Sequence, residues 1–454
     1  MACQCDCNGK PSHPLLANMS SHTTYLQAEA LLPAKHDSQV TTKLDSLLEK
    51  LTQNYKDQNK LSQHQYEEAS MYLPGGSTRS VLHFDPFPMT LASGRDCHVT
   101  SLDGKEYLDL VSEYSAALFG HSQPEIMDAI RITLEHGINL GGPNKQEAVL
   151  AKQLVDRFPS IEKVRFCNSG SEANTMALGT AMAYTGRKKI LVFENGYHGA
   201  FTNFGDHPNP FNIPHDFVIA KYNDVEHTKS LLSPDLAAII LEPMLGAGGM
   251  IPATNEFLQF LRRAATDIGA VLIFDEIITS RLHIHGLQTH YNVYPDMTTL
   301  GKYLGGGFSF GAFGGNDKIM AMFNPGRGYF HSGTYNNNLF SMSAGVAAGK
   351  LLTEDKIAKA NALGDKLRDG INEMAKRHVP EDALPLIRAT GFGSQVGLHY
   401  VGDEQEKLRG CVFFFMLDQG IYMGKRGFIS INLVHEEHHI DMVIEAFRRF
   451  FKEL

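Results

Sequence analysis

Apolar positions recur at a helical spacing in the first part of the chain. From residue 41 to 71 the leucines fall at i, i+3, i+4 and i+7, which predicts an amphipathic helix; they are Leu44, Leu47, Leu48 and Leu51. A Pro-Gly-Gly run at 74–76 ends this helix. Residues 1–38 are polar and have no period, so we expect a mobile tail there.

Short apolar runs then alternate with amphipathic stretches. The apolar runs predict strands at 163–166, 189–193, 237–241 and 271–274. The amphipathic stretches predict helices at 145–158, 171–184 and 255–266. Because such helices connect neighbouring parallel strands, the alternation predicts an α/β fold with a parallel sheet between two layers of helices.

The remaining segments have weaker patterns. Asp103-Gly104, between Val99 and Tyr107, predicts a hairpin turn. A long helical stretch over 346–377, a mixed segment over 384–433 and a last helix over 440–454 predict a C-terminal α+β domain. We therefore expect four parts: the tail over 1–38, a helix and segment over 39–95 that pack with the small domain, a large α/β domain over 96–335, and the small domain over 336–454.

Composition narrows the function. The chain has 454 residues, of which 43% are hydrophobic and 20% charged, and a net charge of −9. This balance is typical of a globular protein and argues against nucleic acid or an anionic membrane as the main partner. No apolar run reaches the roughly 18 residues of a membrane helix, and no secretory signal is visible. We expect a cytoplasmic protein.

The six cysteines do not form a disulfide framework. Cys97, Cys167 and Cys411 are scattered, which favours a reducing compartment. Cys3, Cys5 and Cys7 form a C-x-C-x-C start that suits a soft metal. This start lies in a polar tail without a second group of ligands, so we expect no metal site.

A Ser-Gly-Ser turn, Ser169 to Ser171, lies between a predicted strand and a predicted helix. Backbone N–H groups at the start of a helix, together with nearby hydroxyl groups, favour a phosphate group. The same residues also suit an ordinary helix N-cap with Glu172. The turn by itself leaves both interpretations open.

Two charged residues lie beside apolar segments. Asp275 follows the apolar run 271–274, and ligands of open α/β sheets bind beyond the carboxyl ends of strands. A carboxylate there suits a cationic ring nitrogen or a metal. Lys302 lies among apolar and glycine residues, where burial lowers the pKa of an amine and makes it a nucleophile. Taken singly, a strand-end aspartate and a lysine in a buried turn are both common structural features.

An aromatic pair, Tyr197 and His198, stands between two glycines after the strand at 189–193. Such a pair stacks on a planar heterocycle, although a buried loop aromatic is the commoner case. The four signals together supply a phosphate site, an anion for a ring nitrogen, a stacking ring and an imine-forming amine. Pyridoxal 5′-phosphate (PLP) requires all four, so we predict it as the cofactor.

Several motifs carry a resemblance to a known family over most of the chain, from about Tyr72 to Arg426. They are Gly120–Glu125, Val164–Ala173, Gly196–Gly199, Leu241–Pro243, Phe274–Glu276 and Thr298–Gly307. In these motifs the chain resembles the class III (fold-type I) PLP-dependent aminotransferases of the glutamate-1-semialdehyde aminomutase-like group. It is most similar to the β-phenylalanine (β-amino acid) aminotransferases, whose shorter runs match at Arg79–Leu82, Thr279–Leu282, Ser309–Gly315 and Arg426–Phe428.

The resemblance implies a fold and a role for each matching residue. The fold is a large domain with a mostly parallel seven-stranded sheet between helices, plus a small α+β domain. Lys302 bonds to the cofactor aldehyde and later moves a proton, and Asp275 keeps the pyridine nitrogen protonated. The other cofactor-binding residues are Ser169, Gly170 and Ser171 at the phosphate, Tyr197 and Ile277 on the two ring faces, His198, and Glu242 near the ring edge. Ser171 stands where the family usually has threonine, which keeps the hydroxyl group.

The resemblance also implies a homodimer and a substrate class. Thr334 reaches the phosphate of the cofactor in the other subunit. Arg79 and Arg426 each bind a carboxylate, for which the planar guanidinium is suited. Tyr114 and Phe119 wall the substrate pocket. The expected reaction is ping-pong transfer of an amino group from a β-amino acid, or a related amine, to a keto acid such as 2-oxoglutarate or pyruvate.

Three alternatives stay open. A semialdehyde-type aminomutase moves the amine within one molecule, but in that group the arginine comes later after Pro-Gly-Gly than Arg79 does here. An amine (ω-) transaminase of specialised metabolism would use donors without a carboxylate. A non-catalytic scaffold would have a degraded cofactor site, which the Lys302 and Asp275 pair argues against.

Overall fold

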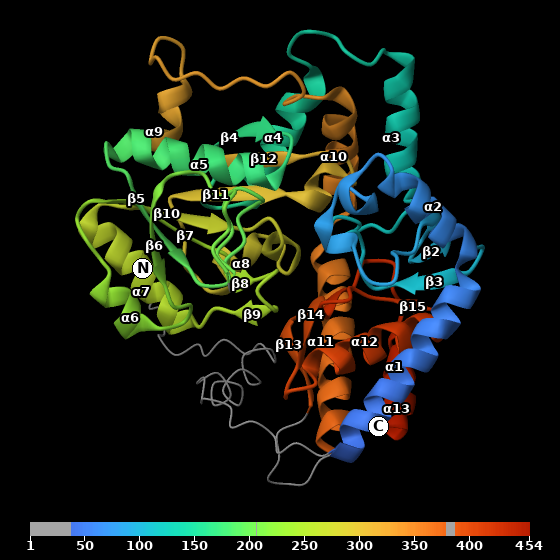
Figure 1. The fold of residues 1–454 in the computed structure, drawn as a ribbon. Helices are drawn as coiled ribbons and strands as arrows, with labels where there is room; N and C mark the ends of the chain where they lie inside the picture. Colours follow the sequence, from blue (N-terminus) through green and yellow to red (C-terminus); the bar gives the residue numbers. More distant parts are fainter. Residues whose placement is uncertain (1–37, 206, 378–385) are drawn as a thin grey trace, which may run out of the picture.

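The computed structural model describes residues 38–205, 207–377 and 386–454, with the backbone alone at 38–41. The predicted tail, with Cys3, Cys5 and Cys7, lies outside these residues apart from Ser38. A large sheet with its helices forms one part of the molecule, and the C-terminal helices and small sheets form another beside it (Figure 1).

The large sheet has seven strands, as predicted. In spatial order they are β4 (Lys163–Cys167), β12 (Gly311–Gly315), β11 (Met297–Gly301), β10 (Val271–Asp275), β7 (Leu236–Leu241), β5 (Lys189–Phe193) and β6 (Asp216–Ala220). β12 runs antiparallel to both of its neighbours, and the other neighbouring pairs are parallel. The sheet is therefore mostly parallel.

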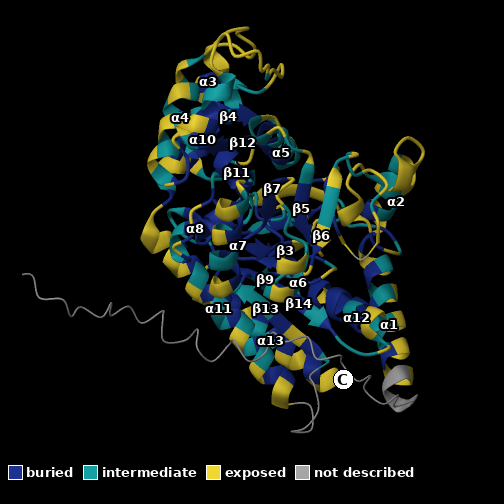
Figure 2. Ribbon diagram, turned by 90° about the vertical axis from the view of Figure 1, so that its left-hand side faces the viewer, coloured by how far each residue is buried: buried dark blue, intermediate teal, exposed yellow. Residues whose placement is uncertain are grey.

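The central strands are apolar throughout because both faces of the sheet are covered. In β10, Leu272 and Phe274 pack into one core cluster, while Val271 and Ile273 pack into the cluster on the opposite face. Helix α7 (Asn255–Ile268) covers the first face and α5 (Gly170–Thr185) covers the second. The central strands accordingly form a buried layer within the molecule (Figure 2).

Two further groups of elements complete the fold. α3 (Pro124–Glu135), α4 (Lys145–Arg157) and α10 (Leu339–Leu351) pack together beside the β4 edge. The C-terminal part contains α11 (Glu354–Arg377), α12 (Gln405–Asp418), α13 (Glu437–Glu453) and an antiparallel sheet of β13 (Ile387–Phe392), β14 (Gln395–Tyr400) and β16 (Phe428–Ser430). A second sheet has the order β1 (Leu91–Arg95), β2 (His98–Ser101), β3 (Glu106–Asp109) and β15 (Ile421–Tyr422).

The first predicted helix is two helices, α1 (Ser38–Gln58) and α2 (Lys60–Ser70), with a break at Asn59. The carboxylate of Asp103, in the hairpin turn between β2 and β3, accepts hydrogen bonds from the backbone N–H groups of Leu61 at 2.7 Å and Ser62 at 3.1 Å. This cap on the start of α2 comes from 41 residues away, which a local apolar period cannot reveal. The single helix predicted over 346–377 is likewise two helices, α10 and α11.

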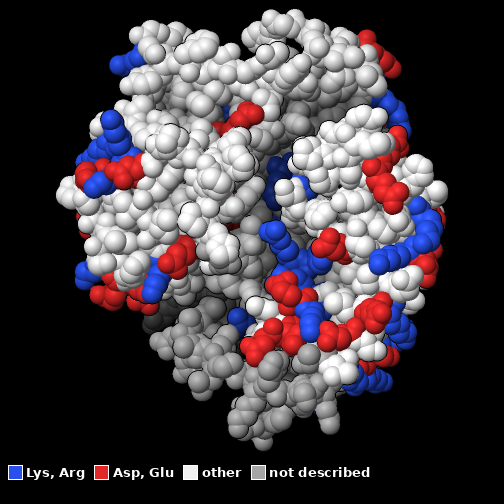
Figure 3. All heavy atoms as spheres, in the orientation of Figure 1, with Lys and Arg blue, Asp and Glu red and all other residues white. Residues whose placement is uncertain are grey.

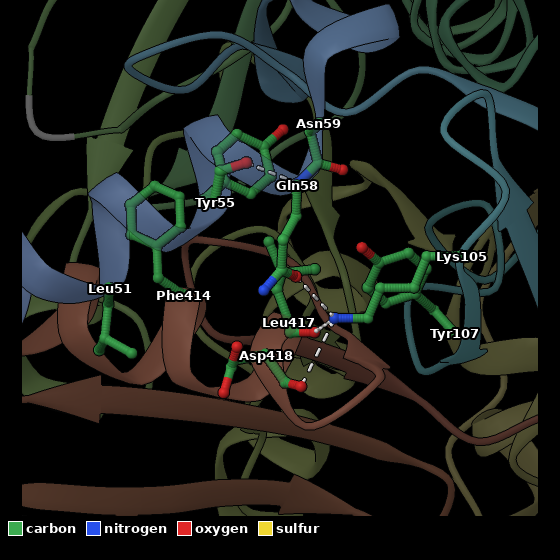
Figure 4. Close-up of a pocket in the computed structure, with 9 residues that line it drawn as sticks. All are labelled: Leu51, Tyr55, Gln58, Asn59, Lys105, Tyr107, Phe414, Leu417 and Asp418. Carbon is green, nitrogen blue, oxygen red and sulfur yellow. Dashed lines mark hydrogen bonds between the residues drawn. The ribbon is translucent and has the colours of Figure 1, made fainter.

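α1 packs against α12, so the N-terminal segment joins the C-terminal part. Lys105 supports this contact: its Nζ donates to the carbonyl oxygen of Leu417 at 3.0 Å and to Gln58 Oε1 at 3.5 Å (Figure 4). The cavity beside it measures about 10 Å³, the space of a single water, so this pocket is part of the packing.

Charges of both signs are interspersed over the lower half of the face in Figure 3, and few lie near its top. A hollow that contains Lys and Arg side chains runs down the middle of this face. Among the described residues, no helix combines the length and the apolar character needed to cross a bilayer.

Candidate active site

The predicted cofactor residues meet at one end of the large sheet, where the carboxyl ends of its parallel strands lie. Asp275 ends β10, and Lys302 follows β11 directly. Glu242 follows β7, and the Gly196–Gly199 loop follows β5. The parallel arrangement brings these residues together although they are distant in sequence.

Asp275 is held by three hydrogen bonds in a buried position, with 3% of its surface exposed. Its Oδ2 accepts from Asn174 Nδ2 at 2.7 Å and pairs with His198 Nδ1 at 2.8 Å, and its Oδ1 accepts from the Ile277 backbone N–H at 3.1 Å. Thr299 Oγ1 donates to Asn174 Oδ1 at 2.6 Å, which fixes the orientation of that amide. The carboxylate is thus oriented on the side of Asn174 and His198.

Glu242 is a second buried acid close to Asp275. Its Oε1 accepts from the Tyr197 N–H at 3.0 Å and its Oε2 from the Gly246 N–H at 2.9 Å. Burial and the nearby Asp275 charge raise the pKa of Glu242 to about 7. Glu242 therefore positions the backbone of the Tyr197 loop.

Lys302 begins the short 3-10 helix η6 (Lys302–Gly305) with a left-handed backbone, φ 53°. Such a conformation is unfavourable for a residue with a side chain and is found at functional sites. Its Nζ donates to the carbonyl oxygen of Tyr114 at 2.5 Å. Burial lowers the pKa of Lys302 to about 8, so the neutral, nucleophilic fraction of the amine near physiological pH is larger than for an ordinary lysine.

The N-terminus of α5 faces the Tyr197 loop and the end of β10. A Cβ on Gly199, whose φ is 119°, would lie 2.4 Å from Ser171 Oγ, and a Cβ on Gly170 would lie 2.5 Å from the side chain of Ile277. Both glycines therefore permit a close approach to the start of the helix. Ser169 Oγ accepts from the Glu172 N–H at 3.2 Å, so this residue is the N-cap of α5 in the structure.

The predicted substrate residues lie around a turn of unusual conformation. Four consecutive residues have left-handed backbones: Ser112, Glu113, Tyr114 and Ser115. The turn places the Glu113 carboxylate in contact with the Arg79 guanidinium, which lies 5.5 Å above the Tyr114 ring. Tyr114 packs against Phe428, with 5.1 Å between ring centroids, and its hydroxyl donates to the Val81 carbonyl.

The other predicted residues are in different surroundings. Tyr197 is 42% exposed, and burial of its remaining part raises its pKa. Arg426 is exposed on the segment before β16, near enough to Tyr114 for its charge to act on that group. Phe119 is buried in the core against Tyr303. Thr334 is exposed on the loop beside a cavity of about 520 Å³ that Ser332, Gly333 and Asn336 help to line.

Three residues at the site have no role in the sequence analysis. Asn174 was detectable, because it is a polar residue on the buried, alanine-rich face of α5. Glu113 gave no signal, since its contact with Arg79 depends on the left-handed turn. Arg281 is 1% exposed, and its guanidinium donates to Ser430 Oγ at 2.6 Å and to the Ile431 carbonyl. Burial lowers the pKa of Arg281 to about 9.

The family model for class-III aminotransferases matches residues 82–451. The chain belongs to the class-III aminotransferase family. The β-phenylalanine transaminase of Variovorax paradoxus is 42% identical over 422 residues, 90% of this chain and 96% of the relative. A crystal structure of a β-phenylalanine aminotransferase from that organism matches with a TM-score of 0.86 at 41% identity, covering 90% of this chain and 97% of that chain.

Two further similar proteins are an aminomutase and a transaminase. A glutamate-1-semialdehyde 2,1-aminomutase of Francisella philomiragia subsp. philomiragia is 34% identical over 436 residues, 87% of this chain and 99% of the relative. A structure described as a transaminase with PLP bound matches at 30% identity with a TM-score of 0.80, covering 87% of this chain and 97% of that chain. The protein is therefore a fold-type I aminotransferase, and PLP is the cofactor of its family.

The residues present fit PLP. The buried Asp275 carboxylate has only an imidazole and two amide N–H groups as hydrogen-bond partners, which leaves its charge available for a protonated ring nitrogen. The N-terminus of α5 suits a phosphate group, and Gly170 and Gly199 let Ile277 and the Tyr197 loop pack close to it. Lys302 offers an amine of lowered pKa at the same carboxyl end of the sheet.

Proposed function

We propose that this aminotransferase moves an amino group from a β-amino acid, or a related amine, to a keto acid such as 2-oxoglutarate or pyruvate. The observation that carries the proposal is the position of Arg79. Its guanidinium lies over Tyr114, whose carbonyl oxygen accepts from Lys302 Nζ, so a carboxylate bound by Arg79 would lie near the reacting amine. The 42% identity to a β-phenylalanine transaminase supports the same substrate class.

PLP, when bound, supplies an aldehyde that takes the amino group and a ring that accepts electrons from the donor carbon. The proposed binding set is Lys302, Asp275, the Ser169–Ser171 turn, Tyr197, Ile277 and Glu242, with His198 acting through Asp275. The N-terminus of α5 would hold the phosphate group. Tyr197 and Ile277 would hold the ring between them.

The chain's own residues would then act on protons and charge. Asp275, oriented by Asn174 and His198, would keep the ring nitrogen protonated. Lys302, once its amine is free, would take a proton from the donor carbon and return it to the cofactor carbon, because its lowered pKa suits both steps. The Tyr114 carbonyl oxygen would hold Lys302 Nζ in place between these two proton transfers.

We also propose that the enzyme is a homodimer. Apolar side chains are exposed on two loops, at Ile138 and Leu140 and at Tyr329, Phe330 and Tyr335. These loops lie at the top of Figure 1, where Figure 3 shows few charges. Thr334 lies on the second loop, from which it would reach the cofactor phosphate of the other subunit. In the substrate pocket, Phe119 and Arg426 would take part beside Arg79 and Tyr114.

A donor and acceptor panel tests the proposal. We would assay β-amino acids, α-amino acids and plain amines with 2-oxoglutarate, with pyruvate and without any keto acid. The proposal predicts that β-amino acids are the best donors and that turnover requires a keto acid. Turnover without a keto acid would favour an aminomutase, and preference for plain amines would contradict the role of Arg79.

A further inference from the structure

A cysteine and two histidines meet outside the proposed active site, in the C-terminal part of the fold. Cys97 and His98 lie at the start of β2, and His439 lies in the first turn of α13. Cys97 Sγ is 3.6 Å from His98 Nδ1 and 3.8 Å from His439 Nε2. The three ligand atoms lie within 4.8 Å of one another, although Cys97 and His439 are 342 positions apart in the sequence.

The two sulfur–nitrogen separations are close to those of a tetrahedral zinc site. With Zn–S near 2.3 Å and Zn–N near 2.0–2.1 Å, a tetrahedron has an S···N edge of about 3.5 Å. The two observed separations exceed that edge by a few tenths of an ångström at most. Small side-chain rotations would therefore give both histidines access to an ion held by the sulfur.

The three residues provide a coordination set of a known type. Cys97 is 2% exposed, whereas His98 and His439 are partly exposed, so an ion would reach the sulfur from the side of the imidazoles. One thiolate and two imidazoles suit zinc better than calcium or magnesium. His435, which is 1% exposed and has no hydrogen-bond partner at Nε2, lies beside His439 with 5.9 Å between ring centroids.

We propose that Cys97, His98 and His439 bind a thiophilic divalent metal ion such as Zn²⁺, with water in the fourth position. Two changes accompany binding. The thiol proton leaves to solvent as the S–metal bond forms. The His439 ring proton moves from Nε2 to Nδ1 so that Nε2 can ligate, and the hydrogen bond from the Glu436 N–H to Nδ1 at 3.0 Å is lost. The ion would join the start of β2 to the start of α13.

Equilibrium dialysis of the holoenzyme against low micromolar Zn²⁺ tests this site. The background is a full-length chain with Cys3, Cys5 and Cys7 replaced by serine, so that the N-terminal cysteines do not bind the ion. We expect one Zn²⁺ per chain, and loss of that ion in Cys97→Ser and in His439→Gln. Cys411→Ser, a buried cysteine elsewhere in the same part, and His438→Gln, the exposed neighbour, should keep it.

A second measurement avoids the substitutions, in case a variant fails to fold. In the unsubstituted site, bound Zn²⁺ should slow alkylation of Cys97 at least roughly tenfold, located by peptide mass spectrometry, while Cys167 and Cys411 react as before. Absence of Zn²⁺ binding, or equal binding in Cys97→Ser, would overturn the proposal and leave a thiol–imidazole hydrogen bond. Neither measurement depends on turnover, so failure here does not bear on the proposed aminotransferase reaction.

Discussion

At the scale of single residues, the site depends on how hydrogen-bond partners orient a few charged groups. Asp275 is fixed by Asn174 and His198, and Lys302 by the carbonyl oxygen of Tyr114. Arg79 differs, because it is paired with Glu113 in the structure. A substrate carboxylate would have to compete with that glutamate for the guanidinium.

Replacing Glu113 by glutamine should therefore favour donors that carry a carboxylate. The ion pair between Arg79 and Glu113 is partly exposed, so it contributes little free energy. The expected decrease in KM for a β-amino acid is therefore about twofold to fivefold. Steady-state kinetics measure it, with a plain amine as the internal control whose KM should not change. An equal shift for both donors would argue against competition at Arg79.

The lowered pKa of Lys302 gives a pH prediction for the cofactor-free protein. The neutral amine attacks the aldehyde, so the rate of recombination with PLP should rise as the pH passes through about 8 and level off above it. An ordinary lysine would place this rise near pH 10.4. Stopped-flow absorbance over a pH series measures the midpoint.

The site could be predicted from the sequence where a residue type has a chemical meaning of its own. Lys302 amid glycines and Asp275 at a strand end are examples, and the structure brings them to one edge of the sheet. Asn174 and Glu113 were missed because their roles arise from tertiary contacts at Asp275 and Arg79. For Ser169 the structure shows the N-cap bond, while its proposed part in phosphate binding remains a prediction.

At the scale of elements, apolar runs identified β4, β5, β7 and β10, but not β6, β11 or β12. β12 reads Gly-Ala-Phe-Gly-Gly and has no apolar period. Its glycines are required by close packing, since a Cβ on Gly311 would lie 2.1 Å from the Ser169 carbonyl oxygen. The break between α1 and α2 also could not be predicted, because the start of α2 is capped by Asp103 from a hairpin turn that is distant in sequence.

The left-handed turn at 112–115 is the element whose strain we expect to be measurable. Ser115 has φ 75°, and its hydroxyl is buried without a partner. Ser115→Gly should therefore stabilise the cofactor-free protein by about 1 kcal/mol. This is the strain that glycine relieves in a left-handed conformation, minus the backbone entropy that glycine loses on folding. Urea unfolding checks this, with Ser46→Gly in α1 expected to destabilise it by a similar amount. A loss of stability in Ser115→Gly would show that the turn is not strained.

At the scale of the whole molecule, the exposed apolar loops at 136–143 and 324–338 predict a subunit interface. Phe330 is 88% exposed, and an aspartate there would place an unpaired charge in the interface. We expect Phe330→Asp to weaken the dimer at least roughly tenfold and to lower activity, because Thr334 could no longer reach the second site. Analytical ultracentrifugation measures the first effect, and Met442→Asp on α13 is the control. A parent protein that is monomeric while fully active would contradict the shared site.

The central claim is that Lys302 carries the cofactor, and borohydride reduction of the holoenzyme tests it most directly. Reduction makes the bond between the lysine and PLP permanent, so that peptide mass spectrometry can locate it. We predict a single pyridoxyl group, on Lys302, and no labelling with loss of turnover in Lys302→Ala. A label on another lysine, or native turnover in Lys302→Ala, would contradict the account.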